Sequence, residues 1–169
     1  NFDKTIEKGH PFAYHVYGTA LTTVTVDCLR GTYEIDAVKV VHDFGSSMNR
    51  AVDLGQVEGG IVQGIGWMTM EEIIYNEEGK LLSNALSTYK IPDIYAVPKI
   101  LDVKFLNTDG NSMAILKSKA VGEPPLMYGI GAYFAIRNAV LAFNPASDIS
   151  YSAPITPEKV LMGLYNNGK

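Results

Sequence analysis

The chain has 169 residues, of which 47% are hydrophobic, 19% charged and 10% aromatic, and its formal net charge is −4. This composition is ordinary for a globular protein with a buried core, and the length suits one domain or two small lobes. The charge pattern does not suggest a nucleic-acid-binding surface, which would need clustered Lys and Arg. No apolar run approaches the roughly 18 residues of a membrane span, so we expect no membrane partner.

Cys28 is the single cysteine, so an internal disulfide is excluded, and we expect it to be inert and half-buried. A lone cysteine is compatible with a reducing compartment, and no signal-peptide pattern is evident. We therefore expect a cytoplasmic protein. The three histidines make no metal-ligand spacing with Cys28, so no metal held by side chains is predicted. The chain begins Asn-Phe-Asp rather than with Met, which suggests processing or a cut from a longer protein.

Two runs rich in β-branched residues predict an antiparallel hairpin in the first third of the chain. The first run covers residues 20–29 and the second covers residues 32–42, with Arg30-Gly31 as the turn.

Further short strands are expected in the middle of the chain. Residues 73–75 and 80–82 flank a polar turn and predict a second hairpin. Residues 100–107 alternate between apolar and polar side chains, which is typical of a strand. A turn over residues 108–111 and a strand over residues 113–117 complete this part.

A glycine-rich helix is predicted over residues 56–70, with Asp53 as a plausible N-cap and Trp67 in the core. Each internal glycine costs a helix about 1 kcal/mol relative to alanine. The usual return is the close approach of another backbone or of a ligand. We interpret the glycines as two helix-packing faces, Gly55/Gly59 and Gly60/Gly64.

Two more helices follow. One runs over residues 126–143 and is initiated by Pro124-Pro125. The last begins with Thr156 as N-cap and Pro157 at the first helical position, and it ends at Tyr165. The predicted fold class is therefore α/β or α+β, with mixed and antiparallel sheets and packed helices.

Glu123 is the first candidate for chemistry. Gly122 before it gives the backbone freedom, and Pro124-Pro125 after it remove that freedom, so the segment holds the side chain in a fixed place. A nearby helix N-terminus favours the carboxylate, while apolar neighbours would oppose its ionisation. Such opposing influences suit a general base. The alternative is an ordinary exposed glutamate before a helix.

Gln56 is the second candidate, because its amide can both donate and accept hydrogen bonds near the predicted helix start. Free N–H groups there would also suit an anionic group such as a phosphate. A surface glutamine is the alternative. The glycine-rich segment is not a phosphate-binding P-loop, because no Gly-Lys-Ser/Thr follows. Lys119, four residues before Glu123, lies either on the same side of an extended backbone or simply on the surface.

Three segments, supported by shorter matches, resemble the C-terminal region of the molybdenum-binding part of xanthine dehydrogenases and aldehyde oxidases. They are Gly55-Gln56-Val57-Glu58-Gly59, Ser87-Thr88-Tyr89-Lys90-Ile91-Pro92 and Lys119-Ala120-Val121-Gly122-Glu123-Pro124-Pro125-Leu126. The shorter matches are Tyr17-Gly18, Val41-His42-Asp43 and Thr156-Pro157-Glu158-Lys159. The likeness covers nearly the whole chain, so it implies one C-terminal fragment, residues 1–169, of a molybdenum-cofactor-binding domain.

The resemblance implies that Glu123 is the base that takes the proton from a molybdenum-bound hydroxyl. Oxygen derived from water then enters an sp² carbon, and hydride passes to the molybdenum site. Gln56, with the preceding Gly55, is expected to bind molybdopterin, whether or not this is the cytosine dinucleotide form. The segment from Val121 to Leu126 resembles xanthine dehydrogenases more closely than aldehyde oxidases, so a purine is the first substrate class that the resemblance implies.

The implied partners are the remainder of the molybdenum-binding subunit, domains or subunits with 2Fe-2S clusters and FAD, and a small-molecule substrate, in a homo- or hetero-oligomer. Substrate-gripping residues of the family lie upstream of this chain, which we expect to be inactive alone. Arg50 departs from the family, where proline is frequent, so we expect the connector before Gln56 to run differently from that of the family. Two alternatives stay open: a hydroxylase for another N-heterocycle or an aldehyde, and a non-catalytic structural or assembly module of the same fold.

Overall fold

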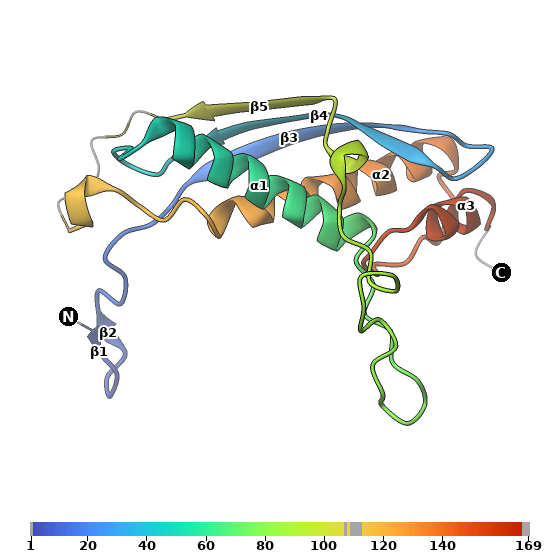
Figure 1. Cartoon of the computed structure of the whole chain (residues 1–169), viewed down its shortest axis with the longest axis horizontal. Coiled ribbons are helices and arrows are strands. Elements are labelled where there is room, and N and C mark those ends of the chain that lie inside the picture. The colour runs from blue at the N-terminus through green and yellow to red at the C-terminus, as the bar shows by residue number, and fades with distance from the viewer. Residues whose placement is uncertain (1, 107, 109–112, 167–169) are drawn as a thin grey trace.

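The structure is a computed structural model that describes residues 2–106, 108 and 113–166. Its body has two layers, with a sheet on one side and the helices α1 and α2 side by side against one face of it (Figure 1). This mixed architecture, with one antiparallel and one parallel strand pair, confirms the predicted fold class.

The sheet has three strands in the order β3-β4-β5. They are β3 (Gly18–Val26), β4 (Tyr33–His42) and β5 (Ile100–Phe105). The β3–β4 pair is the predicted antiparallel hairpin, with a register shift between Thr23 and Val24. Strand β5 was also predicted, and it runs parallel to β4, pairing Ala37 with Ile100. The turn expected after it falls mostly outside the described residues.

Helix α1 (Arg50–Thr69) begins earlier than the sequence suggested. Its N-cap is Asn49, not Asp53, because the Asn49 side chain accepts hydrogen bonds from the backbone N–H groups of Ala51 and Val52. Asp53 instead lies within the first turn and accepts a hydrogen bond of 2.5 Å from the Ser47 hydroxyl. The connector is therefore shorter than predicted.

The predicted helix over residues 126–143 has two parts, a 3-10 turn η3 (Pro124–Gly129) and α2 (Ile130–Phe143). Together, as Pro124–Phe143, they are long and apolar enough to cross a membrane by length and composition, which corrects the expectation that no such run exists. Core helices of soluble proteins pass the same test. Helix α3 (Pro157–Tyr165) has the predicted limits, and the Thr156 hydroxyl accepts a hydrogen bond from Lys159 N–H.

The core lies between the sheet and the helices in two clusters. One is centred on α1 and β4, and the other joins α2 to α3. Their fully buried members include Val38, Val57, Ile61 and Ile65 in the first and Ile136, Val140, Val160 and Leu164 in the second. Trp67, expected in the core, is 45% exposed because it lies on the outer face of α1. Cys28 is half-buried, as predicted.

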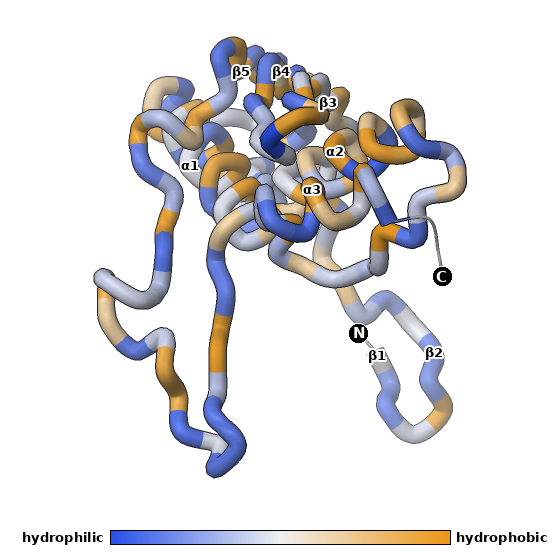
Figure 2. Tube along the Cα trace, turned by 90° about the vertical axis from the view of Figure 1, so that its right-hand side faces the viewer, coloured by the Kyte–Doolittle hydropathy of each residue, from blue (hydrophilic) through white to orange (hydrophobic). Residues whose placement is uncertain are grey.

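Two extended arms leave the body on its helix side (Figures 1 and 2). One, residues 2–17, carries the short pair β1 (Phe2–Asp3) and β2 (Lys8–Gly9). The other, residues 70–98, contains the predicted hairpin, which is reduced to one antiparallel bridge, Tyr75↔Leu81, and the 3-10 turn η1 (Ile94–Ala96). Both arms carry large exposed apolar side chains. These include Ile6, Phe12, Ile73, Tyr75, Leu86 and Ile91.

The strand predicted over residues 113–117 is wrong. The chain forms the 3-10 turn η2 (Ile115–Lys117) there, with Leu116 and Lys117 at positive φ. Positive φ is incompatible with an extended strand. The turn is followed by a bridge between Gly45 and Ser118, which starts the segment that leads to Glu123.

Candidate functional site

Glu123 stands immediately before η3, with Pro124 and Pro125 in the first positions of that turn. Pro125 is buried and Glu123 is exposed. The carboxylate makes no capping hydrogen bond, so within the described part of the chain it is not used to close the turn. The expected apolar neighbours do not cover Glu123 in this chain, although the fixed backbone that the two prolines predicted is present.

Gln56 lies in the second turn of α1, because the helix begins at Arg50. It is therefore not at a free helix N-terminus, and the anion-binding role suggested for that end does not apply to it. Its exposed side chain points towards the Glu123 segment: Oε1 would lie 3.2 Å from a Cβ atom placed on Gly122. Gln56 and the residue before Glu123 are therefore neighbours.

The close approach of these segments depends on Gly60 and Gly64 of α1. A Cβ atom on Gly60 would stand 3.0 Å from the Gly122 carbonyl oxygen, and one on Gly64 would stand 2.1 Å from the Leu126 carbonyl oxygen. Only glycine allows the backbone of residues 122–126 to lie this near the helix. This confirms the predicted packing role of the Gly60/Gly64 face.

The Gly55/Gly59 face behaves differently, since a Cβ atom at either position would meet nothing within 4 Å. Within the described residues nothing packs against this face, so the structure does not show the packing that was predicted for it. With Val52 and Trp67, these glycines form an open stripe along α1 that also includes Gln56. The stripe and Glu123 are accessible to a ligand.

A buried ion pair lies behind the Glu123 segment. Lys119 Nζ is 2.5 Å from an Asp43 carboxylate oxygen, and the side chains are only 9% and 3% exposed. Asp43 also accepts hydrogen bonds from the Thr108 hydroxyl at 2.6 Å and from Gly45 N–H at 3.0 Å. Burial by itself would raise the pKa of Asp43, but these three donors hold it below its ordinary value. Lys119 is thus buried and is not the surface lysine that the sequence offered as one alternative.

The neighbouring His42 is completely buried, and its Nδ1 atom is 2.7 Å from the Tyr128 hydroxyl in η3. The two rings meet edge to face. A Cβ atom on Gly18 would stand 1.7 Å from the Tyr128 hydroxyl oxygen, so the absence of a side chain at Gly18 makes room for this contact. Burial lowers the pKa of His42, while the Asp43 charge opposes that effect. His42 is therefore favoured in its neutral form.

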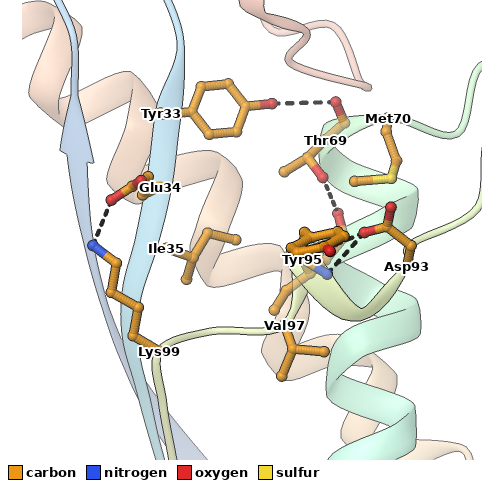
Figure 3. Close-up of a pocket in the computed structure, with 11 residues that line it drawn as sticks. Tyr33, Glu34, Ile35, Thr69, Met70, Asp93, Tyr95, Val97 and Lys99 are labelled. Atoms are coloured by element: carbon orange, nitrogen blue, oxygen red, sulfur yellow. Dashed lines mark hydrogen bonds and ion pairs between the residues drawn. The ribbon is translucent and has the colours of Figure 1, made fainter.

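A separate cavity of about 310 Å³ lies between β4, the end of α1 and the η1 segment (Figure 3). Several polar groups of its lining are already paired within the chain. The Tyr33 hydroxyl donates to Ile155 O at 2.7 Å and Thr69 Oγ1 donates to Ile65 O, while Asp93 caps η1. Because these polar groups are engaged within the chain, this cavity is a weaker candidate than the open face that carries Gln56 and Glu123.

A family model of the molybdopterin cofactor-binding domain matches residues 1–98. The chain therefore belongs to this family, which confirms the resemblance seen in its sequence. Among curated proteins it is 42% identical over 166 residues to aldehyde oxidase 1 of Oryctolagus cuniculus, covering 96% of this chain. It is 44% identical over 158 residues to xanthine dehydrogenase/oxidase of Rattus norvegicus, covering 90% of this chain. In each case the chain spans 12% of the length of the relative.

Solved structures give the same result. Quinoline 2-oxidoreductase from Pseudomonas putida 86 superimposes with a TM-score of 0.79 at 29% identity, over 89% of this chain and 19% of that protein chain. Aldehyde oxidoreductase from Desulfovibrio gigas gives a TM-score of 0.72 at 30% identity, over 92% of this chain and 16% of that chain. The fold is that of part of a larger molybdenum-cofactor-binding protein.

The residues present fit such a cofactor. Gly55 and Gly59 leave the stripe flat and open, and Gln56 offers both a donor and an acceptor beside it. Among the described residues, no group of three or more His, Cys, Asp and Glu side chains could hold a metal ion.

Sequence reasoning singled out Glu123 and Gln56 but did not predict the polar contacts behind them, which join Asp43 to Lys119 and His42 to Tyr128. Their signal was present at Val41-His42-Asp43, where two titratable residues end an apolar strand. Such residues are buried only when they are paired. The partners could not be identified from the sequence, because Lys119 and Tyr128 lie far along the chain.

Proposed function

We propose that this chain forms one side of the active site of a molybdenum hydroxylase, with Glu123 as general base and Gln56, together with Gly55, as a molybdopterin contact. The proposal rests on one observation: Gln56 lies against Gly122, the residue before Glu123, beside an open stripe of α1. A cofactor that contacts Gln56 would therefore lie next to the carboxylate. The match to the family of cofactor-binding domains supports the same arrangement.

The bound cofactor would supply the oxygen transfer and the two-electron oxidation of the substrate. Glu123 would accept a proton through a carboxylate oxygen from the oxygen nucleophile as it attacks an electron-poor sp² carbon. Pro124 and Pro125 would limit movement of the carboxylate, because their φ angles are fixed. Gln56 would orient the cofactor through its amide.

A purine such as xanthine is the first substrate class that we propose, from the segment Val121–Leu126. The aldehyde oxidases are equally similar to this chain, which favours an aldehyde as a second candidate. The quinoline enzyme extends this alternative to another N-heterocycle. We further propose that electrons leave through 2Fe-2S clusters and FAD in other domains or subunits. Assays of the assembled enzyme with xanthine, a simple aldehyde and quinoline would rank the classes.

Glu123→Gln in the assembled enzyme tests the central assignment. We expect kcat to fall by at least about 10²-fold, the usual scale for a lost general base, with molybdenum content unchanged. Glu78→Gln is the matched control, because Glu78 lies in the exposed turn of the 70–98 arm. Turnover of Glu123→Gln close to that of the wild type would contradict the assignment and favour the structural-module alternative.

A further inference from the structure

We propose that His42 and Asp43 are positioning residues for Glu123, and that they hold the two ends of its turn through Tyr128 and Lys119. The inference rests on the proposed function of Glu123 as general base. It assigns a role to a polar cluster that does not itself face the open stripe.

The first tether lies on the N-terminal side of the turn. Asp43 follows β4, the central strand of the sheet, and its carboxylate is fixed by Lys119, Thr108 and Gly45 N–H. The backbone is joined here too, because Lys119 N–H donates to Phe44 O at 2.7 Å. A buried ammonium group has no solvent to replace its partner, so Lys119 stays where Asp43 is.

The second tether lies on the C-terminal side. His42 is the last residue of β4, and its Nδ1 atom contacts the Tyr128 hydroxyl within η3 at 2.7 Å. The Tyr128 ring also packs edge-on against the imidazole. Gly18 of β3 leaves the space that this hydroxyl occupies. The turn that follows Glu123 is thereby attached to the same end of the same strand.

Glu123 lies between the tethers, four residues after Lys119 and five before Tyr128. Gly60 and Gly64 of α1 pack directly against the backbone of this segment. His42, the last residue of β4, and Asp43, which follows it, therefore fix both ends of the turn, while the close contact with Gly60 and Gly64 fixes its distance from α1. Among the described residues, the Glu123 carboxylate makes no capping hydrogen bond that would compete with its role as a base.

Tyr128→Phe in the assembled enzyme is the mildest test, because it removes one hydroxyl and keeps the ring. We expect kcat to fall about tenfold with KM and molybdenum content unchanged, since a misplacement of about 1 Å can cost about 10²-fold. Tyr133→Phe is the matched control. Its hydroxyl donates to Ser150 O at 3.0 Å from a buried ring on α2, and not to His42 or the Glu123 turn, so kcat should stay unchanged.

Asp43→Asn weakens the other tether with a side chain of the same shape, and the same loss in kcat is expected. The decisive measurement combines each variant with Glu123→Gln. If the tethers act through Glu123, Tyr128→Phe and Asp43→Asn should change the residual kcat of Glu123→Gln by less than about twofold, because residues that act as a unit are not additive.

The outcomes separate the two proposals. Unchanged kcat in both tether variants would overturn the inference and leave the base assignment intact. A full, additive loss in the Glu123→Gln background would overturn it as well, since a merely structural role predicts additivity. A Glu123→Gln enzyme with near wild-type turnover would overturn the proposed function itself.

Discussion

Gly64 of α1 lies directly against the backbone of Leu126, so that a Cβ atom on Gly64 would stand 2.1 Å from the Leu126 carbonyl oxygen. Neither partner can give way easily, because both are backbone segments in the interior of the fold. The distance between α1 and the Glu123 turn is thus set by the absence of one side chain.

We predict that Gly64→Ala destabilises the protein by about 1–3 kcal/mol, the usual cost of overpacking, and lowers turnover of the assembled enzyme. Gly59→Ala is the control on the same helix, where a Cβ atom meets nothing in this chain. In Gly59→Ala the gain in helix propensity, about 1 kcal/mol, should stabilise the protein or leave its stability unchanged. Thermal unfolding midpoints of the two variants provide the comparison. Equal midpoints would contradict the close contact.

The Asp43 cluster predicts a pH dependence of stability. Burial raises the pKa of the Asp43 carboxyl, but hydrogen bonds from Lys119, Thr108 and Gly45 N–H hold that pKa below the ordinary value of 3.8. A group whose pKa is depressed on folding contributes its full stabilisation above the unfolded pKa, and loses it as the pH falls through the folded pKa. The thermal unfolding midpoint should therefore decrease as the pH is lowered below about 4. In Asp43→Asn this decline should be shallower, and an identical pH profile would argue against the pair.

Gln56→Ala should loosen the cofactor, because a polar group of the pterin would lose its partner at a cost of about 1–3 kcal/mol. Molybdenum per protein, measured after purification and dialysis, should fall. Glu78→Ala is a suitable control, since Glu78 is also exposed but lies in the turn of the 70–98 arm, away from α1. Full molybdenum occupancy and normal activity in Gln56→Ala would exclude a contact between this amide and the cofactor.

The 169-residue chain alone should bind no molybdenum and should self-associate. The open stripe of α1 and the apolar side chains of both arms, such as Phe12 and Ile91, are uncovered. Large exposed apolar patches favour association. Light scattering and metal analysis of the chain, expressed with and without the region encoded upstream, would test this. A monomer that carries molybdenum and oxidises xanthine would refute it.

Local signals in the sequence were sufficient to predict the elements whose structure depends mainly on residues nearby in the chain. The β3–β4 hairpin follows from two β-branched runs and a Gly31 turn with φ of +70°. Helix α3 follows from Thr156 and Pro157, whose capping chemistry is the same in any fold. Strand β5 could be read from its alternation, although its parallel pairing with β4 could not.

The sequence predictions were wrong where two local structures are both compatible with the same residues. Asn49 and Asp53 are both good N-caps, and only the packing of the connector selects Asn49. Residues 113–117 look extended, yet contacts with the Gly45 loop turn the backbone at Leu116. In the site, the exposed Glu123 could be found from its neighbours in sequence. The buried ion pair could not, because it joins residues that meet only in the folded chain.

The parallel pairing of β5 with β4 has a consequence for the tolerance of the chain to insertions. Between these strands lie α1 and the long 70–98 arm, so the sheet is completed by closing a large loop. The entropy of closing a loop grows only with the logarithm of its length, and doubling the length costs about 0.6 kcal/mol. Residues added at the tip of the arm, near Gly79, should therefore leave the register of Ala37 with Ile100 intact. The same length should make β5 the last strand to join during folding.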